Sequence, residues 1–268
     1  MSRLEKRLQQ RAAEKRKSFV AYITAGDPHL DETVDLVLAL GRSGVDVVEL
    51  GVPFSDPLAD GPTNQRAAER ALASGTDLQG ILKVVAKIRQ KDAELPIVLF
   101  SYVNPMFHMG FETFAQAAAA AGVDGVLTVD LPPEEASSYR SILHTAGLDT
   151  IFLASPTSDR KRLQLVQQQS SGFVYYVSRT GVTGVQQELS QSLESEMAVV
   201  RSEVKLPIMV GFGIATPEQA VTVSRMGDGI IIGSAIVRLI EEAPTPAARL
   251  QSVSDFANSI RRALDASV

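Results

Sequence analysis

The fold is decided by the stretch Gly44-Val45-Asp46-Val47-Val48-Glu49-Leu50, in which a helical pattern ends and an apolar strand begins. Glycine just past the end of a helix accepts the left-handed conformation that closes the helix, and the chain then enters the strand. The same junction recurs at Gly122-Val123-Asp124 and Gly147-Leu148-Asp149, with variants at Gly172-Phe173 and Gly227-Asp228-Gly229. This recurrence predicts a chain in which helices and strands alternate.

The apolar runs of the chain give eight predicted strands. They are Phe19–Thr24, Val45–Leu50, Ile97–Tyr102, Gly125–Val129, Thr150–Ala154, Phe173–Val177, Ile208–Gly211 and Gly229–Ile232. The runs are continuously apolar, as expected for parallel strands that helices cover. Eight strand–helix units predict an α/β fold, a single (β/α)₈ TIM barrel that forms one catalytic domain over residues 1–268. A doubly wound open sheet is the alternative.

The first residues predict an additional N-terminal helix. Leu4, Leu8 and Ala12 share one face at helical spacing, and the remaining face is basic and expected to be solvated. The segment has no apolar core of the kind that a secretory signal needs. No apolar stretch reaches the ~18 residues of a membrane span, so we expect a cytoplasmic protein with no membrane partner.

Composition excludes several classes of function. The net charge of −5 argues against a nucleic-acid-binding surface. The chain has no cysteine, which excludes disulfides, thiolate zinc sites and cysteine nucleophiles. The three histidines, His29, His108 and His144, follow no metal-ligand spacing, so we expect no metal site.

Two acidic residues eleven positions apart are the first candidates for catalysis. Glu49 lies in a strand that is otherwise apolar, and Asp60 follows a proline-rich loop just before a helical stretch. One near-buried and one more flexible carboxylate suit proton-transfer chemistry. The alternative is purely structural: a glutamate at a strand end and an aspartate that caps a helix.

Glycine-containing turns after the last three predicted strands indicate an anion site. Glycines let backbone N–H groups approach an anion, and a helix that begins at Gly233-Ser234 adds its positive end. Loops after strands seven and eight form the usual phosphate site of TIM barrels. The predicted phosphate-binding residues are Gly184, Gly213, Gly233 and Ser234.

Apolar and aromatic residues near the strand ends are expected to line a pocket between the acids and the phosphate site. They are Tyr22, Phe100, Tyr102, Leu127, Tyr175, Phe212 and Ile232. The alternative for many of them is filling of the barrel core. A site of this kind would take a flat apolar group at one end and a phosphate at the other.

Taken together, these motifs resemble the tryptophan synthase alpha chain family. The most specific part is Glu49 followed by Pro53-Phe54-Ser55-Asp56-Pro57-Leu58-Ala59-Asp60-Gly61-Pro62. Supporting parts are Asn104-Pro105, Ser178-Arg179 with Gly181-Val182-Thr183-Gly184, and Gly211-Phe212-Gly213-Ile214. The resemblance implies retro-aldol cleavage of indole-3-glycerol phosphate to indole and glyceraldehyde 3-phosphate, as one step of L-tryptophan biosynthesis.

The resemblance also implies roles for three catalytic residues. Glu49 would protonate the indole C3 and then remove the proton of the side-chain hydroxyl, and Asp60 would accept a hydrogen bond from the indole N–H. Thr183 would order a loop that closes over the site, with Gly181 and Gly184 as hinges. A disordered surface loop is the alternative for that segment.

The family works with a pyridoxal-phosphate-dependent beta chain, so the resemblance implies an alpha2beta2 complex and no cofactor in this chain. Asp56, Pro57 and Asn104 are the expected contact residues. Three other interpretations remain: an isomerase with the same phosphate loops, a free-standing lyase without a partner, and an inactive regulatory subunit.

Overall fold

The computed structural model of the chain describes residues 1–177, 197–211 and 213–267, and the strands in these ranges form one parallel sheet. Its order is β5-β4-β3-β2-β1-β9-β8-β7-β6. The strands are β1 (Ser18–Thr24), β2 (Val47–Gly51), β3 (Ile97–Ser101), β4 (Gly125–Thr128), β5 (Asp149–Ile151), β6 (Leu153–Ala154), β7 (Val174–Val177), β8 (Ile208–Gly211) and β9 (Gly229–Ile232).

The chain itself closes this sheet into a barrel. β5 and β6 lie at the two ends of the strand order and are separated in sequence only by Phe152. The first pairs with β4 and the second with β7, and Tyr175 N donates a hydrogen bond to Phe152 O at 3.1 Å. The predicted (β/α)₈ barrel is therefore confirmed, with the single predicted strand Thr150–Ala154 divided in two.

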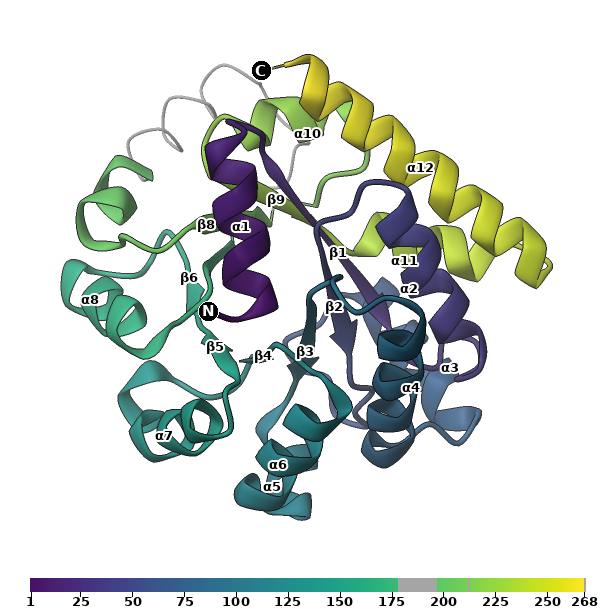
Figure 1. Cartoon of the computed structure of the whole chain (residues 1–268), viewed down its shortest axis with the longest axis horizontal. Coiled ribbons are helices and arrows are strands. Elements are labelled where there is room, and N and C mark those ends of the chain that lie inside the picture. The colour runs from purple at the N-terminus through teal and green to yellow at the C-terminus, as the bar shows by residue number, and fades with distance from the viewer. Residues whose placement is uncertain (178–196, 212, 268) are drawn as a thin grey trace.

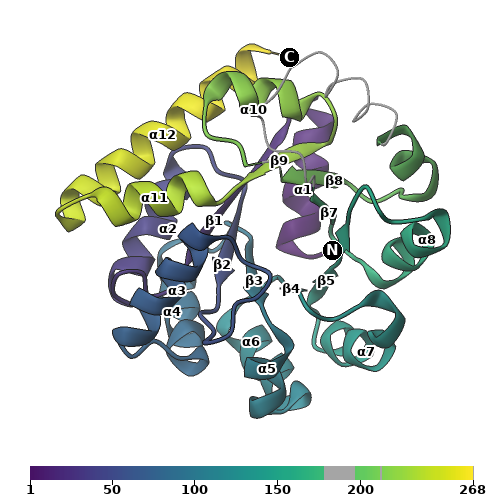
Figure 2. The same cartoon turned by 180° about the vertical axis from the view of Figure 1, so that it is seen from behind.

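Helices surround the strands as an outer ring (Figures 1 and 2). They are α1 (Arg3–Ala13), α2 (Glu32–Arg42), α3 (Pro62–Ala73), α4 (Leu78–Lys91), α5 (Val103–Met109), α6 (Phe111–Ala121), the short η1 (Pro133–Glu135), α7 (Ser137–Thr145), α8 (Arg160–Gln169), α10 (Pro217–Ser224), α11 (Ser234–Glu242) and α12 (Pro246–Ala266). Residues 197–203 are also helical. None of the described helices is both long and apolar enough to cross a membrane.

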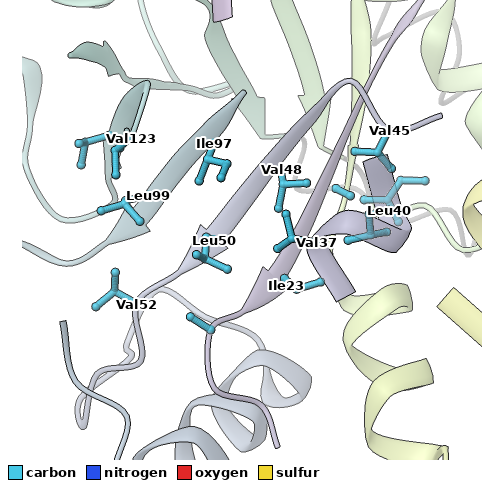
Figure 3. Close-up of a cluster of buried hydrophobic side chains, with 14 of the residues drawn as sticks. Ile23, Val37, Leu40, Val45, Val48, Leu50, Val52, Ile97, Leu99 and Val123 are labelled. Carbon is cyan, nitrogen blue, oxygen red and sulfur yellow. The ribbon is translucent and has the colours of Figure 1, made fainter. Parts of the chain in front are cut away.

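Successive strand residues point alternately to the helices and to the barrel interior. Val48 and Leu50 of β2 belong to the outer cluster, which packs against helices such as α2 (Figure 3). Val47 of the same strand belongs to the inner cluster, with Val20, Val98, Leu127, Ile151, Phe173, Met209 and Ile231. Both faces of each strand are thus buried, which explains why the runs are continuously apolar.

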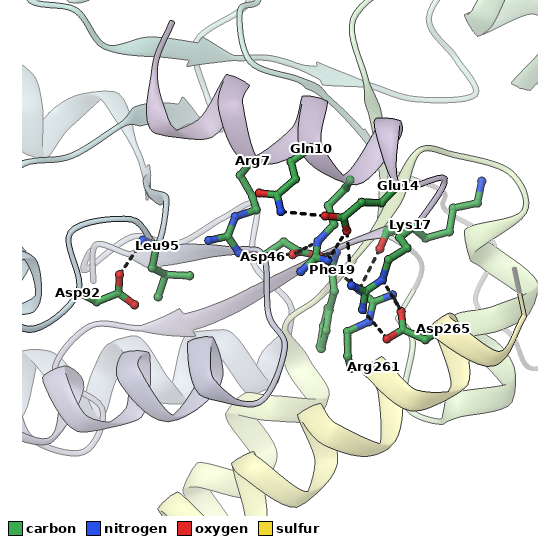
Figure 4. Close-up of polar contacts among 12 residues, drawn as sticks. Arg7, Gln10, Glu14, Lys17, Phe19, Asp46, Asp92, Leu95, Arg261 and Asp265 are labelled. Atoms are coloured by element: carbon green, nitrogen blue, oxygen red, sulfur yellow. Dashed lines mark hydrogen bonds and ion pairs between the residues drawn. The ribbon is translucent and has the colours of Figure 1, made fainter.

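The predicted N-terminal helix is present as α1, which lies across one end of the barrel (Figure 1). Leu4 and Leu8 are buried in the inner cluster, so α1 closes that end. Its basic face is not simply solvated, contrary to expectation. Arg7 and Arg11 form ion pairs with the buried Asp46, and Arg261 of α12 approaches the same carboxylate at 3.4 Å (Figure 4).

The aspartates of the recurring junctions have a structural role. Asp46 Oδ2 accepts a hydrogen bond from Phe19 N at 2.9 Å, where β1 begins. Asp124 Oδ2 accepts one from Ile97 N, and Asp228 Oδ2 accepts one from Ile208 N, both at 2.8 Å. Each of these three carboxylates therefore accepts a hydrogen bond from a backbone N–H at the start of the preceding strand. Without it, this N–H would be buried without a partner.

Candidate active site

Glu49 lies on the inner face of β2, one layer nearer the carboxyl ends of the strands than Val47. Its side chain is fully buried, and neither carboxyl oxygen accepts a hydrogen bond from any described residue. Burial raises the pKa of Glu49 to about 8, because an ionised carboxylate is poorly solvated there. At neutral pH the group is therefore predominantly protonated and able to donate a proton.

A cavity of about 560 Å³ opens above Glu49 at the carboxyl ends of the strands. Its lining consists of Tyr22, Glu49, Gly61, Pro62, Thr63, Asn64, Phe100, Tyr175, Val177, Gly211, Gly213, Ile214, Ile231, Gly233, Ser234 and Arg238. The carboxyl group and the glycine turns expected to bind phosphate thus face the same space. A cavity of this size suits one small-molecule ligand.

Aromatic rings form one wall of the cavity next to Glu49. The parallel register places Tyr22 of β1 opposite Glu49 of β2. The Tyr22 and Phe100 rings meet edge to face, with centroids 5.1 Å apart. Tyr22 and Tyr175 are both buried deeply enough that burial raises their pKa values, so both hydroxyls stay protonated. The wall can therefore hold a flat apolar ring beside a neutral carboxyl group.

Asp60 lies on the loop between β2 and α3 and is held by its neighbours. Tyr102 Oη donates a hydrogen bond to Asp60 Oδ2 at 2.8 Å and accepts one from Ala59 N at 3.0 Å. Burial raises the pKa of Asp60, while the hydrogen bonds from Tyr102 and Asn64 act in the opposite direction. These contacts hold the carboxylate directly before Gly61 and Pro62, which line the cavity.

The two acids lie at the same end of the barrel. Glu49 is near the carboxyl end of β2, and Asp60 lies on the segment that leads from β2 to α3. Glu49 lines the cavity together with Gly61 and Pro62, which directly follow Asp60, whereas Asp60 itself is not among the lining residues. The segment after β2 therefore brings the second acid to the edge of the space that the first acid faces.

The opposite end of the cavity is suited to an anion. α11 begins at Ser234, directly after Gly233, so its first backbone N–H groups have no partner within the helix. Gly213 has a left-handed φ of 65°, and side chains other than glycine adopt that conformation at a cost. A Cβ at Gly233 would lie 3.3 Å from the Tyr22 side chain, so glycine keeps this turn open.

Some of the residues that were expected to line the cavity lie elsewhere in the structure. Ile232 points outward into the outer cluster, and Ile231 lines the cavity instead, because neighbouring strand residues face opposite sides. Leu127 is buried in the inner cluster and does not line the cavity. Tyr102 also lies outside the lining and holds Asp60.

Other predicted residues lie outside the described part of the chain. These are Thr183, Gly184 and Phe212, together with the rest of the glycine loop after β7. Conversely, Asn64 and Arg238 both line the cavity, although neither was predicted from the sequence. Arg238 stands one helical turn after Ser234, a spacing that could have revealed it.

The expected contact residues lie on a loop and a helix that follow two neighbouring strands. Asp56 and Pro57 belong to the loop after β2, and Asn104 belongs to α5, after β3. The hydrogen bond from Ala59 N to Tyr102 Oη connects these segments. Within residues 1–177, 197–211 and 213–267, no group of side chains could hold a metal ion.

Comparisons with known proteins agree on one family. A family model described as tryptophan synthase alpha chain matches residues 8–265. The chain is 51% identical to the tryptophan synthase alpha chain of Geobacter sulfurreducens, over 93% of this chain and 94% of that one. It is 48% identical to the alpha chain of Geobacter sp. strain M21, over 98% and 97% of the two chains.

Solved structures lead to the same result. A crystal structure of tryptophan synthase subunit alpha from Legionella pneumophila superposes with a TM-score of 0.92 at 41% identity, over 99% of both chains. A chain of the aminoacrylate-bound tryptophan synthase from M. tuberculosis superposes with a TM-score of 0.87 at 32% identity, over 98% of this chain and 100% of that one.

Proposed function

Since the chain belongs to the tryptophan synthase alpha chain family, we propose that Glu49 and Asp60 catalyse the reaction of that family in the cavity above β2. The chain is a lyase of L-tryptophan biosynthesis, and it cleaves indole-3-glycerol phosphate to indole and glyceraldehyde 3-phosphate. The observation that carries the assignment is a fully buried carboxyl group, without a hydrogen-bond partner among the described residues, that lines the same cavity as Gly213 and Gly233.

The chemistry requires two proton transfers near the indole ring. Protonation of C3 by Glu49 turns the ring into an electron sink, so that the bond between C3 and the glycerol side chain can break. The resulting carboxylate then removes the proton of the side-chain hydroxyl, which becomes the aldehyde of glyceraldehyde 3-phosphate. Asp60 accepts a hydrogen bond from the indole N–H and stabilises the positive charge that develops on the ring.

The phosphate binds at the other end of the substrate, at Gly213, Gly233 and Ser234. Tyr22, Phe100 and Tyr175 contact the indole in this arrangement. On the sequence motif Gly181-Val182-Thr183-Gly184 alone, we propose that Thr183, Gly184 and Phe212, which lie outside the described residues, also take part in the reaction. Residues 1–268 act as one catalytic domain.

Release of indole by the purified chain tests the proposal directly. We expect indole from indole-3-glycerol phosphate in a ratio of one to one with glyceraldehyde 3-phosphate, and faster release when a beta chain is added. Rates that are equal with and without the beta chain would favour the free-standing lyase, and no release under either condition would favour the inactive subunit. An isomerase would convert the substrate without releasing indole.

The pH dependence follows from the raised pKa of Glu49. The protonated form is the one that starts the reaction, and it is lost as the pH rises through about 8. We therefore expect kcat/KM to fall about tenfold per pH unit above that value. Steady-state rates between pH 6 and 10 measure this, and a profile that stays flat through pH 9.5 would contradict the role of Glu49 as the acid.

Arg238 is expected to favour binding of the phosphate group. It is the only cationic side chain among the described residues that line the cavity. Arg238→Ala should raise KM ~3–5-fold and leave kcat nearly unchanged, as expected for one exposed charge. The matched control is Arg225→Ala, an exposed arginine that does not line the cavity; equal KM values in both variants would exclude the role of Arg238.

An alpha chain of this family has a beta-chain partner. We propose an alpha2beta2 assembly in the cytoplasm, in which Asp56, Pro57 and Asn104 contact the beta chain. Their place after the carboxyl ends of β2 and β3, on segments joined by the hydrogen bond from Ala59 N to Tyr102 Oη, supports this choice. In the proposed assembly, pyridoxal phosphate belongs to the beta chain, and the alpha chain works without a cofactor.

A further inference from the structure

The two ends of the cavity lie next to the first residues of two different helices. α3 begins at Pro62, directly after Asp60 and Gly61, and α11 begins at Ser234 in the anion site. A substrate that reaches from the acids to the anion site therefore requires a defined position of α3 relative to α11. We propose that Asp27, Arg66, Arg70 and Glu241 form an ionic clamp that sets this position, and that they act as positioning residues for the proposed reaction.

The first half of the clamp joins α3 to the end of β1. Arg70 donates from Nε and Nη2 to the two carboxyl oxygens of Asp27, at 2.7 and 2.8 Å. Asp27 is only 1% exposed, and burial raises its pKa while the hydrogen bonds and the charge of Arg70 act in the opposite direction. Ser74, which follows α3, donates a hydrogen bond to Gly26 O at 3.3 Å and secures the same loop.

The second half joins α3 to α11. Arg66 donates from Nε and Nη2 to the two carboxyl oxygens of Glu241, at 2.8 and 2.9 Å. Arg70 Nη1 donates to Glu241 Oε1 at 2.8 Å, so one arginine connects both halves. Hydrogen bonds from Arg66 lower the pKa of Glu241 to about 2, and the carboxylate is charged at every pH at which the enzyme works.

The apolar contact between the two helices is small. Ala67 of α3 and Val237 of α11 meet only Tyr22 and Phe100 in a separate buried cluster. A contact of one alanine and one valine sets little directional geometry between the helices, whereas two bidentate pairs have a fixed planar geometry. The same cluster contains Tyr22, so a shift of either helix would also move the wall beside Glu49.

The outer half of the clamp is partly exposed, with 49% of the Arg66 side chain and 26% of the Glu241 side chain accessible. Such pairs contribute little to folding stability. A small displacement of reacting groups, by contrast, can lower a rate by orders of magnitude. Loss of the outer half should therefore affect the ligand that spans the cavity more than the stability of the fold.

The test compares ligands for one end with a ligand for both ends, using calorimetry on the full chain. Inorganic phosphate probes the anion site, indole probes the acid end, and 3-(indol-3-yl)propyl phosphate spans the two. In Glu241→Gln we expect affinities for phosphate and indole within about twofold of the wild type, and an affinity for the spanning ligand reduced on the order of tenfold. Arg66→Gln should give the same selective loss, and Glu241→Asp should recover part of it.

The matched control is Glu203→Gln, which removes another surface ion pair, with Arg160 at 3.0 Å, away from the cavity lining. It should leave all three affinities unchanged. If the spanning ligand binds Glu241→Gln and the wild type with equal affinity, the clamp is overturned and the proposed function is not. The same conclusion follows if the variant loses affinity equally for all three ligands. Since the inference rests on the proposed function, a wild-type chain that binds the spanning ligand no more tightly than indole or phosphate would overturn both.

Discussion

Glu49→Gln should lower kcat for the cleavage of indole-3-glycerol phosphate by at least ~10²–10⁴-fold, the usual contribution of a general acid–base group. The amide has nearly the shape of the protonated carboxyl but cannot deliver a proton to C3 or remove one from the hydroxyl. Because one residue serves both steps, the loss should lie at the upper end of that range. Single-turnover measurement of indole release gives the rate of the chemical step.

The same variant should remain folded and should bind the substrate. The raised pKa of Glu49 means that the folded state holds its proton more tightly than the unfolded state. Stability from the protonated form is therefore full below the ordinary pKa of 4.5 and is lost as the pH rises through about 8. Glutamine does not ionise, so the variant should be at least as stable as the wild type at pH 9. Wild-type turnover by the variant would eliminate the assignment.

Asp60→Asn should lower kcat by about 10²-fold with the fold retained. The asparagine lacks the negative charge that stabilises the positively charged indole ring in the transition state. It also replaces one acceptor oxygen with a donor, which would compete with the hydrogen bond from Tyr102 Oη. Binding of 3-(indol-3-yl)propyl phosphate should weaken much less, because that ligand has no developing charge.

Tyr102→Phe provides the control for this second prediction. It removes the 2.8 Å hydrogen bond to Asp60 and the acceptor for Ala59 N but leaves the carboxylate in place. The loss of kcat should be clearly smaller than in Asp60→Asn. Equal losses in the two variants would mean that Asp60 acts by holding the loop after β2 and not by its charge.

Much of the fold could be predicted from local patterns alone. The Gly-Val-Asp junctions and the apolar runs placed eight strands within a few residues of their observed positions. The roles of Asp46 and Asp124 were not predicted, since each accepts a hydrogen bond from an N–H near the start of the preceding strand, 27 residues earlier. The break at Phe152 was not predicted either, because an apolar run carries no information about which neighbour each half pairs with.

For the site, the types of residue were easier to predict than the direction in which each side chain points. Ile231 and Ile232 are equally apolar and adjacent, so only the register with β1 and β8 decides which of them faces the cavity. Leu127 was misplaced in another way: it is buried in the inner cluster but is not among the residues that line the cavity. Arg238 was missed because a basic residue in an amphipathic helix is ordinarily assigned to solvent.

Residue types and their spacing along the chain were enough to predict the barrel and the family, and they led to Glu49 and Asp60 as the proposed catalytic acids. The three-dimensional arrangement was needed to show that Glu49 is buried without a described partner, that Ile231 lines the cavity in place of Ile232, and that Arg66 and Arg70 reach Glu241. Burial, pKa and ion pairing arise from groups brought together across the ring of strands and helices, such as Arg70 and Glu241, which are 171 residues apart in the chain. Such contacts leave no local pattern, because the solvation of each group depends on segments remote from it in the sequence.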